Sequence, residues 1–266
     1  MKTKQWDYLA QLQLFANYRA RDQETDCDNC KPIQFCQYES NNYLNSFRNK
    51  YGLDRFITGN DDQTARGIMR WVFEVLLHSN YAENTIQYDD SNDMIAKSKK
   101  SRVTLNCYCH AYILRDALQS AGIVSRLVYC LPLNCDFLGN HVVVEYYSNN
   151  LKQWVLADPT YNINLVDDHG GLLDLVTFRK RIINQELIFI VDNNRFVENN
   201  NRSRNQTLAG YINMMVPILV VLQYESTVGY HIHNYRLIPD KYLIPSQQIN
   251  TESMSYIYSF APLYGV

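Results

Sequence analysis

The residues best suited to chemistry lie between positions 105 and 158. The stretch LNCYCHAYILRDALQSAGIVSRL (105–127) places Cys107 at the apparent start of a helix. Unpaired backbone N–H groups and the helix dipole favour an anion at that position. They therefore lower the pKa of a thiol toward the thiolate, the form that attacks carbonyl carbon. The sequence predicts Cys107 as a nucleophile.

A cysteine nucleophile needs a base to take its proton and a third polar group to hold that base. His141 opens the apparent strand HVVVEYY, and Asp158 closes the next apparent strand in WVLADPT. A short polar turn joins these strands, so we expect an antiparallel hairpin in which the first residue of one strand faces the last residue of the other. Pro159 restricts Asp158 to extended geometry and so marks a strand end. We predict that His141 and Asp158 face each other.

The elements that must position these residues follow from periodicity. Apolar residues recur at helical spacing from Cys107 to Ala121, Gly122 ends that helix, and from 123 onward the period changes to two. Asp61 or Asp62 is expected to cap a helix that follows GNDDQ. Further helices are expected at 4–18, 40–50 and 172–184, strands at 123–131, 141–147, 153–158 and 186–191, and loops at 80–103 and 192–206. The last sixty residues are expected to form strands and irregular chain.

The expected fold class is α+β, with N-terminal helices first and the 107–121 helix packed against an antiparallel sheet. We expect a single domain over 1–266, made of an N-terminal helical part (1–103), a catalytic core (104–191) and a C-terminal extension (192–266). A chain of this length can bury a sizeable core.

The arrangement resembles the transglutaminase-like superfamily of cysteine enzymes. The resemblance rests on the cysteine that opens a helix, Ala111 four residues later, GIVSR (122–126), HVVVEYY and WVLADPT. More loosely, FRNKYGLD, MRWVFEVLLH and VDDHGGLLDLVTFRKRII look like flanking segments of bacterial members. The resemblance implies a papain-like α+β core and acyl transfer through a cysteine thioester, with Cys107 as nucleophile, His141 as base and Asp158 as the orienting acid.

The resemblance leaves the outcome of the reaction open between amide formation, deamidation and amide or peptide hydrolysis. A peptide, protein or carrier-bound acyl donor and an amine or water acceptor would be the partners, with no cofactor and no calcium. Many members have a glycine before the cysteine, where this chain has Leu105 and Asn106, and Val124 replaces a common proline. The backbone N–H of Cys107 is expected to donate to the oxyanion. The second donor is unassigned, with Trp71 and Asn106 as candidates.

Two other classes of function compete with the enzyme. One is a non-catalytic peptide- or protein-binding module on the same fold. The other is a protein organised by a metal bound to Cys27, Cys30 and Cys36 in CDNCKPIQFC. A structural zinc site wants four ligands, and only His231 and His233 remain to complete it, so we expect a reduced loop without metal.

Several other reactive side chains are expected to be structural. Cys109 and His110 are expected to lie off the helix face of Ala111 and Leu114, and His110 to be a poor alternative base for Cys107. Asp167 and Asp168 before Gly-Gly indicate a turn more than a cation site. We expect His78 and His169 at surface positions.

Composition excludes several classes of partner. The formal net charge of −2 provides no basic field for a nucleic acid. The N-terminal residues lack the unbroken apolar core of a signal peptide, and the longest apolar run, MMVPILVVL, is about half the length of a membrane span. The seven cysteines are therefore expected to be reduced thiols in a cytoplasm. The oligomeric state is left open.

Overall fold

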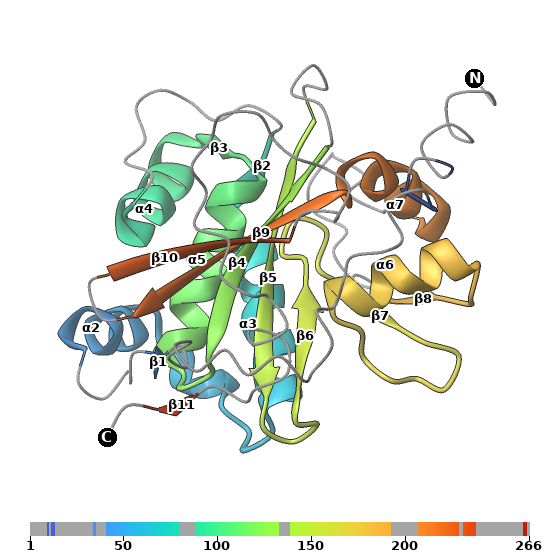
Figure 1. Ribbon diagram of the computed structural model, residues 1–266. Coiled ribbons are helices and arrows are strands. Elements are labelled where there is room, and N and C mark those ends of the chain that lie inside the picture. Colours follow the sequence, from blue (N-terminus) through green and yellow to red (C-terminus); the bar gives the residue numbers. More distant parts are fainter. Residues whose placement is uncertain are drawn as a thin grey trace.

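The computed structural model describes residues 41–79, 89–132, 139–192, 207–228 and 231–237, with residues 10, 12, 13, 34, 35, 263 and 264. Its centre is a five-stranded antiparallel sheet in the order β10-β9-β4-β5-β6 (Figure 1). The strands are β4 (Ser125–Leu131), β5 (His141–Ser148), β6 (Gln153–Ala157), β9 (Val221–Val228) and β10 (His231–Leu237). The expected α+β class with an antiparallel sheet is confirmed.

Helices cover both faces of this sheet (Figure 1). One face packs against α2 (Asn42–Tyr51), η2 (Leu53–Phe56), α3 (Asp61–Val75), α4 (Ser91–Ser101) and α5 (Cys107–Ser120). The other packs against α6 (Leu175–Asn184), α7 (Leu208–Met215) and η3 (Val216–Ile218). Val142 and Val144 of β5 belong to the first core and Val143 to the second. Burial on both faces explains why β5 carries three valines in succession.

Three small strand pairs complete the described fold. β2 (Leu77–His78) pairs in parallel with β3 (Thr104–Leu105), directly before α5. β7 (Ile163–Val166) pairs antiparallel with β8 (Phe189–Asp192), and β1 (Gln34–Phe35) pairs in parallel with β11 (Leu263–Tyr264). The β2–β3 pair matters for the site because it holds the chain that enters α5.

The β5–β6 hairpin is antiparallel as predicted, but its register corrects one detail. The last paired residues are Val144 and Ala157, so Asp158 comes level with Val143 and not with His141. His141 and Asp158 are therefore diagonal neighbours, two positions apart along the hairpin. A diagonal pair is still within reach of an imidazole and a carboxylate.

Two helices appear where none was predicted. α4 lies in the expected loop at 80–103; Asp90 caps it, and its buried face is so small that the apolar pattern is weak. α7 lies in the C-terminal part that was expected to hold strands and irregular chain. It is apolar nearly all round, so its sequence shows no helical period.

The N-terminus of α3 also differs from expectation. Asn60 is the cap, and its side chain accepts the N–H of Gln63 at 2.9 Å. Asp62 instead turns inward and accepts hydrogen bonds from the hydroxyls of Tyr146 (2.9 Å) and Ser148 (3.0 Å) on β5. The residue expected as a cap therefore ties α3 to the central sheet.

Some expectations fall on parts of the chain that are not described. The helix at 4–18 and the loop at 192–206 lie almost entirely outside the described residues, as do Cys27, Cys30 and Cys36. Within the described part, none of the helices has the length and hydropathy that crossing a bilayer requires.

Candidate active site

Cys107 is the first residue of α5. The side chain of Asn106 caps this helix by accepting the N–H of Cys109 at 3.1 Å, and Asn106 itself has extended backbone. The helix then packs along β5, and Gly122, with φ of 83°, lies just beyond its end. Cys107 is half-buried, so its thiol lies at the helix tip where backbone N–H groups are unpaired.

His141 and Asp158 form a buried hydrogen-bonded pair. The Nε2 atom of His141 lies 2.7 Å from Oδ2 of Asp158, whose side chain is fully buried. Oδ1 of Asp158 accepts the backbone N–H of Thr160 at 2.9 Å. The backbone of Asp158 pairs with Ile163 across a tight turn, in which Asn162 has a φ of 56°. This turn fixes the carboxylate immediately after β6 ends.

The ring of His141 also interacts with Cys107, so the structure brings all three predicted residues together. Burial raises the pKa of the Cys107 thiol, but the hydrogen bond and charge of His141, with a backbone hydrogen bond at Val142, lower that pKa overall. Burial lowers the pKa of His141, but the charge and hydrogen bond of Asp158, joined by Cys107, raise it overall. The lowered pKa of Cys107 and the raised pKa of His141 together favour a thiolate beside an imidazolium. Since Nε2 bonds to Asp158, Nδ1 is the ring nitrogen left for the sulfur.

These pKa directions predict how Cys107 reacts with iodoacetamide. The alkylation rate follows the thiolate, and a lowered pKa means that the thiolate is lost only as the pH falls through a value below that of an ordinary cysteine. Between pH 7 and 8.5 the rate at Cys107 is expected to rise by clearly less than the gain of about tenfold that an ordinary thiol shows. Peptide mass spectrometry at each pH measures the rate. A rate at Cys107 that rises in parallel with that of a model thiol would contradict the prediction.

The other described cysteines are in apolar surroundings. Cys109 is fully buried in the core under α5, and burial raises its pKa to about 12. Cys130 on β4 is also fully buried, and burial raises its pKa well above the ordinary value. Both thiols stay protonated at neutral pH, which agrees with a structural role for Cys109.

The ring of His141 begins a row of ring contacts. Tyr161, from the turn after Asp158, has its ring centroid 5.8 Å from that of His141. His78 lies 6.4 Å from Tyr161 and 5.5 Å from His110, again between ring centroids. His78 is half-buried here, so the expected surface position was wrong. His110 is fully buried, and its Nδ1 lies 2.9 Å from the carbonyl oxygen of Asn106.

Tyr211 is a site residue that the sequence did not reveal. From α7, its hydroxyl donates a hydrogen bond to Oδ2 of Asp158 at 3.0 Å. The only sequence signal was an apolar stretch, which gave no reason to connect residue 211 with residue 158.

Both candidates for the second oxyanion donor have structural roles. Trp71 is buried in the core, with its ring 5.6 Å from that of Tyr51 on α2. The side-chain oxygen of Asn106 caps α5, and its Nδ2 group is the atom that could donate to an oxyanion. The helix tip, with the N–H of Cys107, offers backbone donors.

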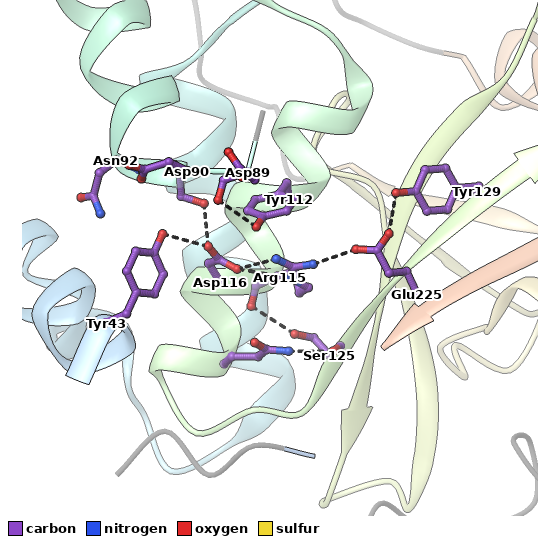
Figure 2. Close-up of polar contacts among 12 residues, drawn as sticks. Tyr43, Asp89, Asp90, Asn92, Tyr112, Arg115, Asp116, Ser125, Tyr129 and Glu225 are labelled. Carbon is purple, nitrogen blue, oxygen red and sulfur yellow. Dashed lines mark hydrogen bonds and ion pairs between the residues drawn. The ribbon is translucent and has the colours of Figure 1, made fainter. Parts of the chain in front are cut away.

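A buried ion network anchors α5 away from the thiol (Figure 2). Arg115 lies 2.9 Å from Asp116 and 3.2 Å from Glu225 of β9. Figure 2 shows the hydroxyls of Tyr43 and Tyr129 directed at this centre. Asp116 also accepts hydrogen bonds from the hydroxyls of Tyr43 in α2 (3.1 Å) and Ser91 in α4 (2.8 Å). Glu225 accepts a hydrogen bond from the hydroxyl of Tyr129 in β4 (2.9 Å). The network fixes the helix that carries Cys107 against the sheet.

The described residues hold no group of three or more metal-ligating side chains. Asp167 accepts the backbone N–H groups of His169 (2.9 Å) and Gly171 (2.7 Å), while Asp168 pairs with Arg181 at 3.0 Å. The two carboxylates therefore shape a turn, as the sequence indicated. His231 and His233 lie in β10, and the three N-terminal cysteines fall outside the described ranges.

Residues 53–159 match the transglutaminase-like superfamily, and this segment contains Cys107, His141 and Asp158. The match runs from η2 to the residue after Asp158, so α6, α7, β9 and β10 lie beyond it. The transglutaminase-like recognition made from the sequence is confirmed.

Two solved structures are similar to the chain. One is a proposed cysteine protease from Cytophaga hutchinsonii, with 17% identity over 61% of this chain and 50% of that chain, and a TM-score of 0.34. The other is a proposed protease from Parabacteroides distasonis, with 15% identity over 58% of this chain and 26% of that chain, and a TM-score of 0.29. The chain thus spans half or less of the length of these two proteins. A comparison with curated proteins finds no match.

Proposed function

We propose that the protein is an enzyme that transfers acyl groups through a thioester on Cys107. His141 moves the proton, and Asp158 orients and stabilises the imidazolium. The observation that carries the proposal is the buried His141–Asp158 pair, 2.7 Å apart, beside a Cys107 thiol whose pKa the same imidazole lowers. A base held by a third polar group beside a nucleophile is the arrangement that covalent acyl transfer requires.

In the first half of the reaction, the sulfur of Cys107 attacks the carbonyl carbon of an amide, ester or thioester. A C–S bond forms, and the carbonyl electrons move to oxygen, where N–H groups at the tip of α5 stabilise the negative charge. When the tetrahedral intermediate collapses, the bond to the leaving group breaks, and the imidazolium of His141 supplies the proton that an amine leaving group needs. The product is a neutral imidazole beside a thioester.

In the second half, an acceptor attacks the thioester. His141 removes a proton from an amine or water as its new bond to the acyl carbon forms, and the C–S bond breaks to restore the thiolate–imidazolium pair. An amine acceptor gives an amide. Water gives hydrolysis, which is deamidation when the donor is a side-chain carboxamide.

Acyl capture on Cys107 tests the proposal directly. The protein is incubated with a p-nitrophenyl ester and, separately, with a glutamine-containing peptide, and intact mass is recorded. The expected result is an adduct of the acyl mass that neutral hydroxylamine removes, as it does a thioester. The adduct is expected to be absent in Cys107→Ala and to persist in Cys109→Ala, the matched control on the same helix.

Two results would count against the enzyme. If no adduct forms and Cys107 also resists iodoacetamide at neutral pH, the fold serves as a binding module and not as a catalyst. If an adduct forms but persists in Cys107→Ala, the nucleophile is another residue.

A further inference from the structure

We propose that Tyr211 is a positioning residue that holds Asp158 in place and divides its negative charge between the phenol and His141. This inference rests on the proposed function, since it concerns the same Cys107–His141–Asp158 site. It assigns a role to α7, which lies beyond the segment that matches the superfamily.

The carboxylate of Asp158 is held by three donors. Oδ2 lies 2.7 Å from Nε2 of His141 and accepts the hydroxyl of Tyr211 at 3.0 Å, while Oδ1 accepts the N–H of Thr160 at 2.9 Å. The side chain of Asp158 is fully buried, so each donor replaces hydration that the ion has lost. Donors on both oxygens fix the rotation of the carboxylate group. Tyr211 shares Oδ2 with the imidazole, and so it acts on the oxygen that orients His141.

Tyr211 is itself rigidly placed. Its side chain is fully buried, and its ring meets the rings of Tyr161 and Phe178, each with centroids 6.1 Å away. Burial and the charge of Asp158 hold the pKa of Tyr211 well above its ordinary value. The phenol therefore keeps its proton, and it remains a donor over the whole pH range in which the enzyme would work.

A second contact from α7 reaches the same site. The hydroxyl of Tyr161 lies 3.3 Å from the sulfur of Met214, and the ring of Tyr161 packs beside His141. One short helix thus supports both the carboxylate behind His141 and the ring next to it. Both polar contacts of α7, from Tyr211 to Asp158 and from Tyr161 to Met214, are additional to the apolar packing of this helix against the sheet.

The charge on Oδ2 sets how strongly His141 holds its proton. Donation from Tyr211 draws off part of that charge, so its loss would leave more charge facing the imidazolium and raise the pKa of His141. The titratable groups around His141 in the described structure come from several elements. They are Cys107 of α5, Cys130 of β4, Asp158 after β6, Tyr161 of the next turn, His78 of β2 and Tyr211 of α7.

The test is the pH dependence of Cys107 alkylation by iodoacetamide in Tyr211→Phe. Wild type is expected to show two steps in rate, the first when the thiolate–imidazolium pair forms and the second when the imidazolium loses its proton. In Tyr211→Phe the second step is expected to move upward by about half a pH unit or more, the scale set by one hydrogen bond to an ion. Replacing Tyr211 with 3-fluorotyrosine makes the phenol a stronger donor, and the second step is expected to move downward.

Tyr146→Phe is the matched control. Tyr146 is also fully buried, and its hydroxyl donates to the carboxylate of Asp62 at 2.9 Å, toward the other end of β5. Its loss is expected to lower stability and to leave both steps in place. If neither Tyr211 variant moves the second step, Tyr211 only packs and the inference is wrong. If the alkylation rate of wild type shows no step below the pKa of an ordinary thiol, Cys107 is not activated and the proposed enzyme function is wrong. That result differs from a failure of the Tyr211 inference, in which the first step is present and only the second step stays in place.

Discussion

Replacing His141 with alanine is expected to slow alkylation of Cys107 at pH 7 by about 100-fold or more. The half-buried thiol then loses the hydrogen bond and the positive charge that lower its pKa, while burial and Asp158 continue to raise it. Only a small fraction remains as thiolate at pH 7. The measurement is the second-order rate constant for iodoacetamide at Cys107, read by peptide mass spectrometry.

Two comparisons separate this effect from a folding defect. His169→Ala removes an exposed histidine from a turn, and it is expected to leave the rate unchanged. Raising the pH toward 10 should restore much of the rate in His141→Ala, since the thiol then ionises without a partner. An alanine variant that is alkylated at pH 7 as fast as wild type would show that His141 does not activate Cys107.

Breaking the ion pair between Arg126 and Glu145 is expected to have the largest effect on stability. The two residues are direct partners across β4 and β5, both are buried, and Nη2 of Arg126 lies 2.6 Å from Oε2 of Glu145. Arg126→Met leaves the carboxylate without its counter-ion, and the free energy of unfolding is expected to fall by about 3–5 kcal/mol. Urea denaturation followed by circular dichroism measures the loss.

Two variants test whether the unpaired charge is the cause. Arg126→Met combined with Glu145→Gln removes both charges and keeps an acceptor for the N–H of Leu175, which Glu145 binds at 2.8 Å. This double variant is expected to be more stable than Arg126→Met alone. Arg70→Met breaks an exposed pair with Glu74 and is expected to cost less than about 1 kcal/mol. Equal losses in Arg126→Met and Arg70→Met would refute the argument.

The sequence was sufficient for the parts of the site that depend on local pattern. Helical spacing from Cys107, strand periodicity from 123 to 158 and Pro159 placed each of the three residues at the end of an element, and the structure has them there. The two-residue offset in the hairpin was missed because register depends on the turn between the strands and not on where the apolar runs begin and end.

The missed features depend on contacts between distant parts of the chain. Tyr211 meets Asp158 from 53 residues away, and Arg115 meets Glu225 from 110 residues away. No period or spacing records such contacts, because each residue taken alone resembles ordinary core or surface. α4 and α7 were missed for the opposite reasons, since one has too narrow an apolar stripe and the other is apolar all round.

The strand order has a consequence for how the protein matures. β4 pairs on one side with β5, which follows it closely in the chain, and on the other with β9, which is synthesised much later. Until β9 arrives, a growing polypeptide would present the open edge of β4 as a template for neighbouring chains. The hydrogen bond from Tyr211 to Asp158 would also wait until α7 is made. Folding of the sheet should therefore be slow and sensitive to the concentration of incomplete chains, because the late strand β9 covers the edge that β4 first leaves open.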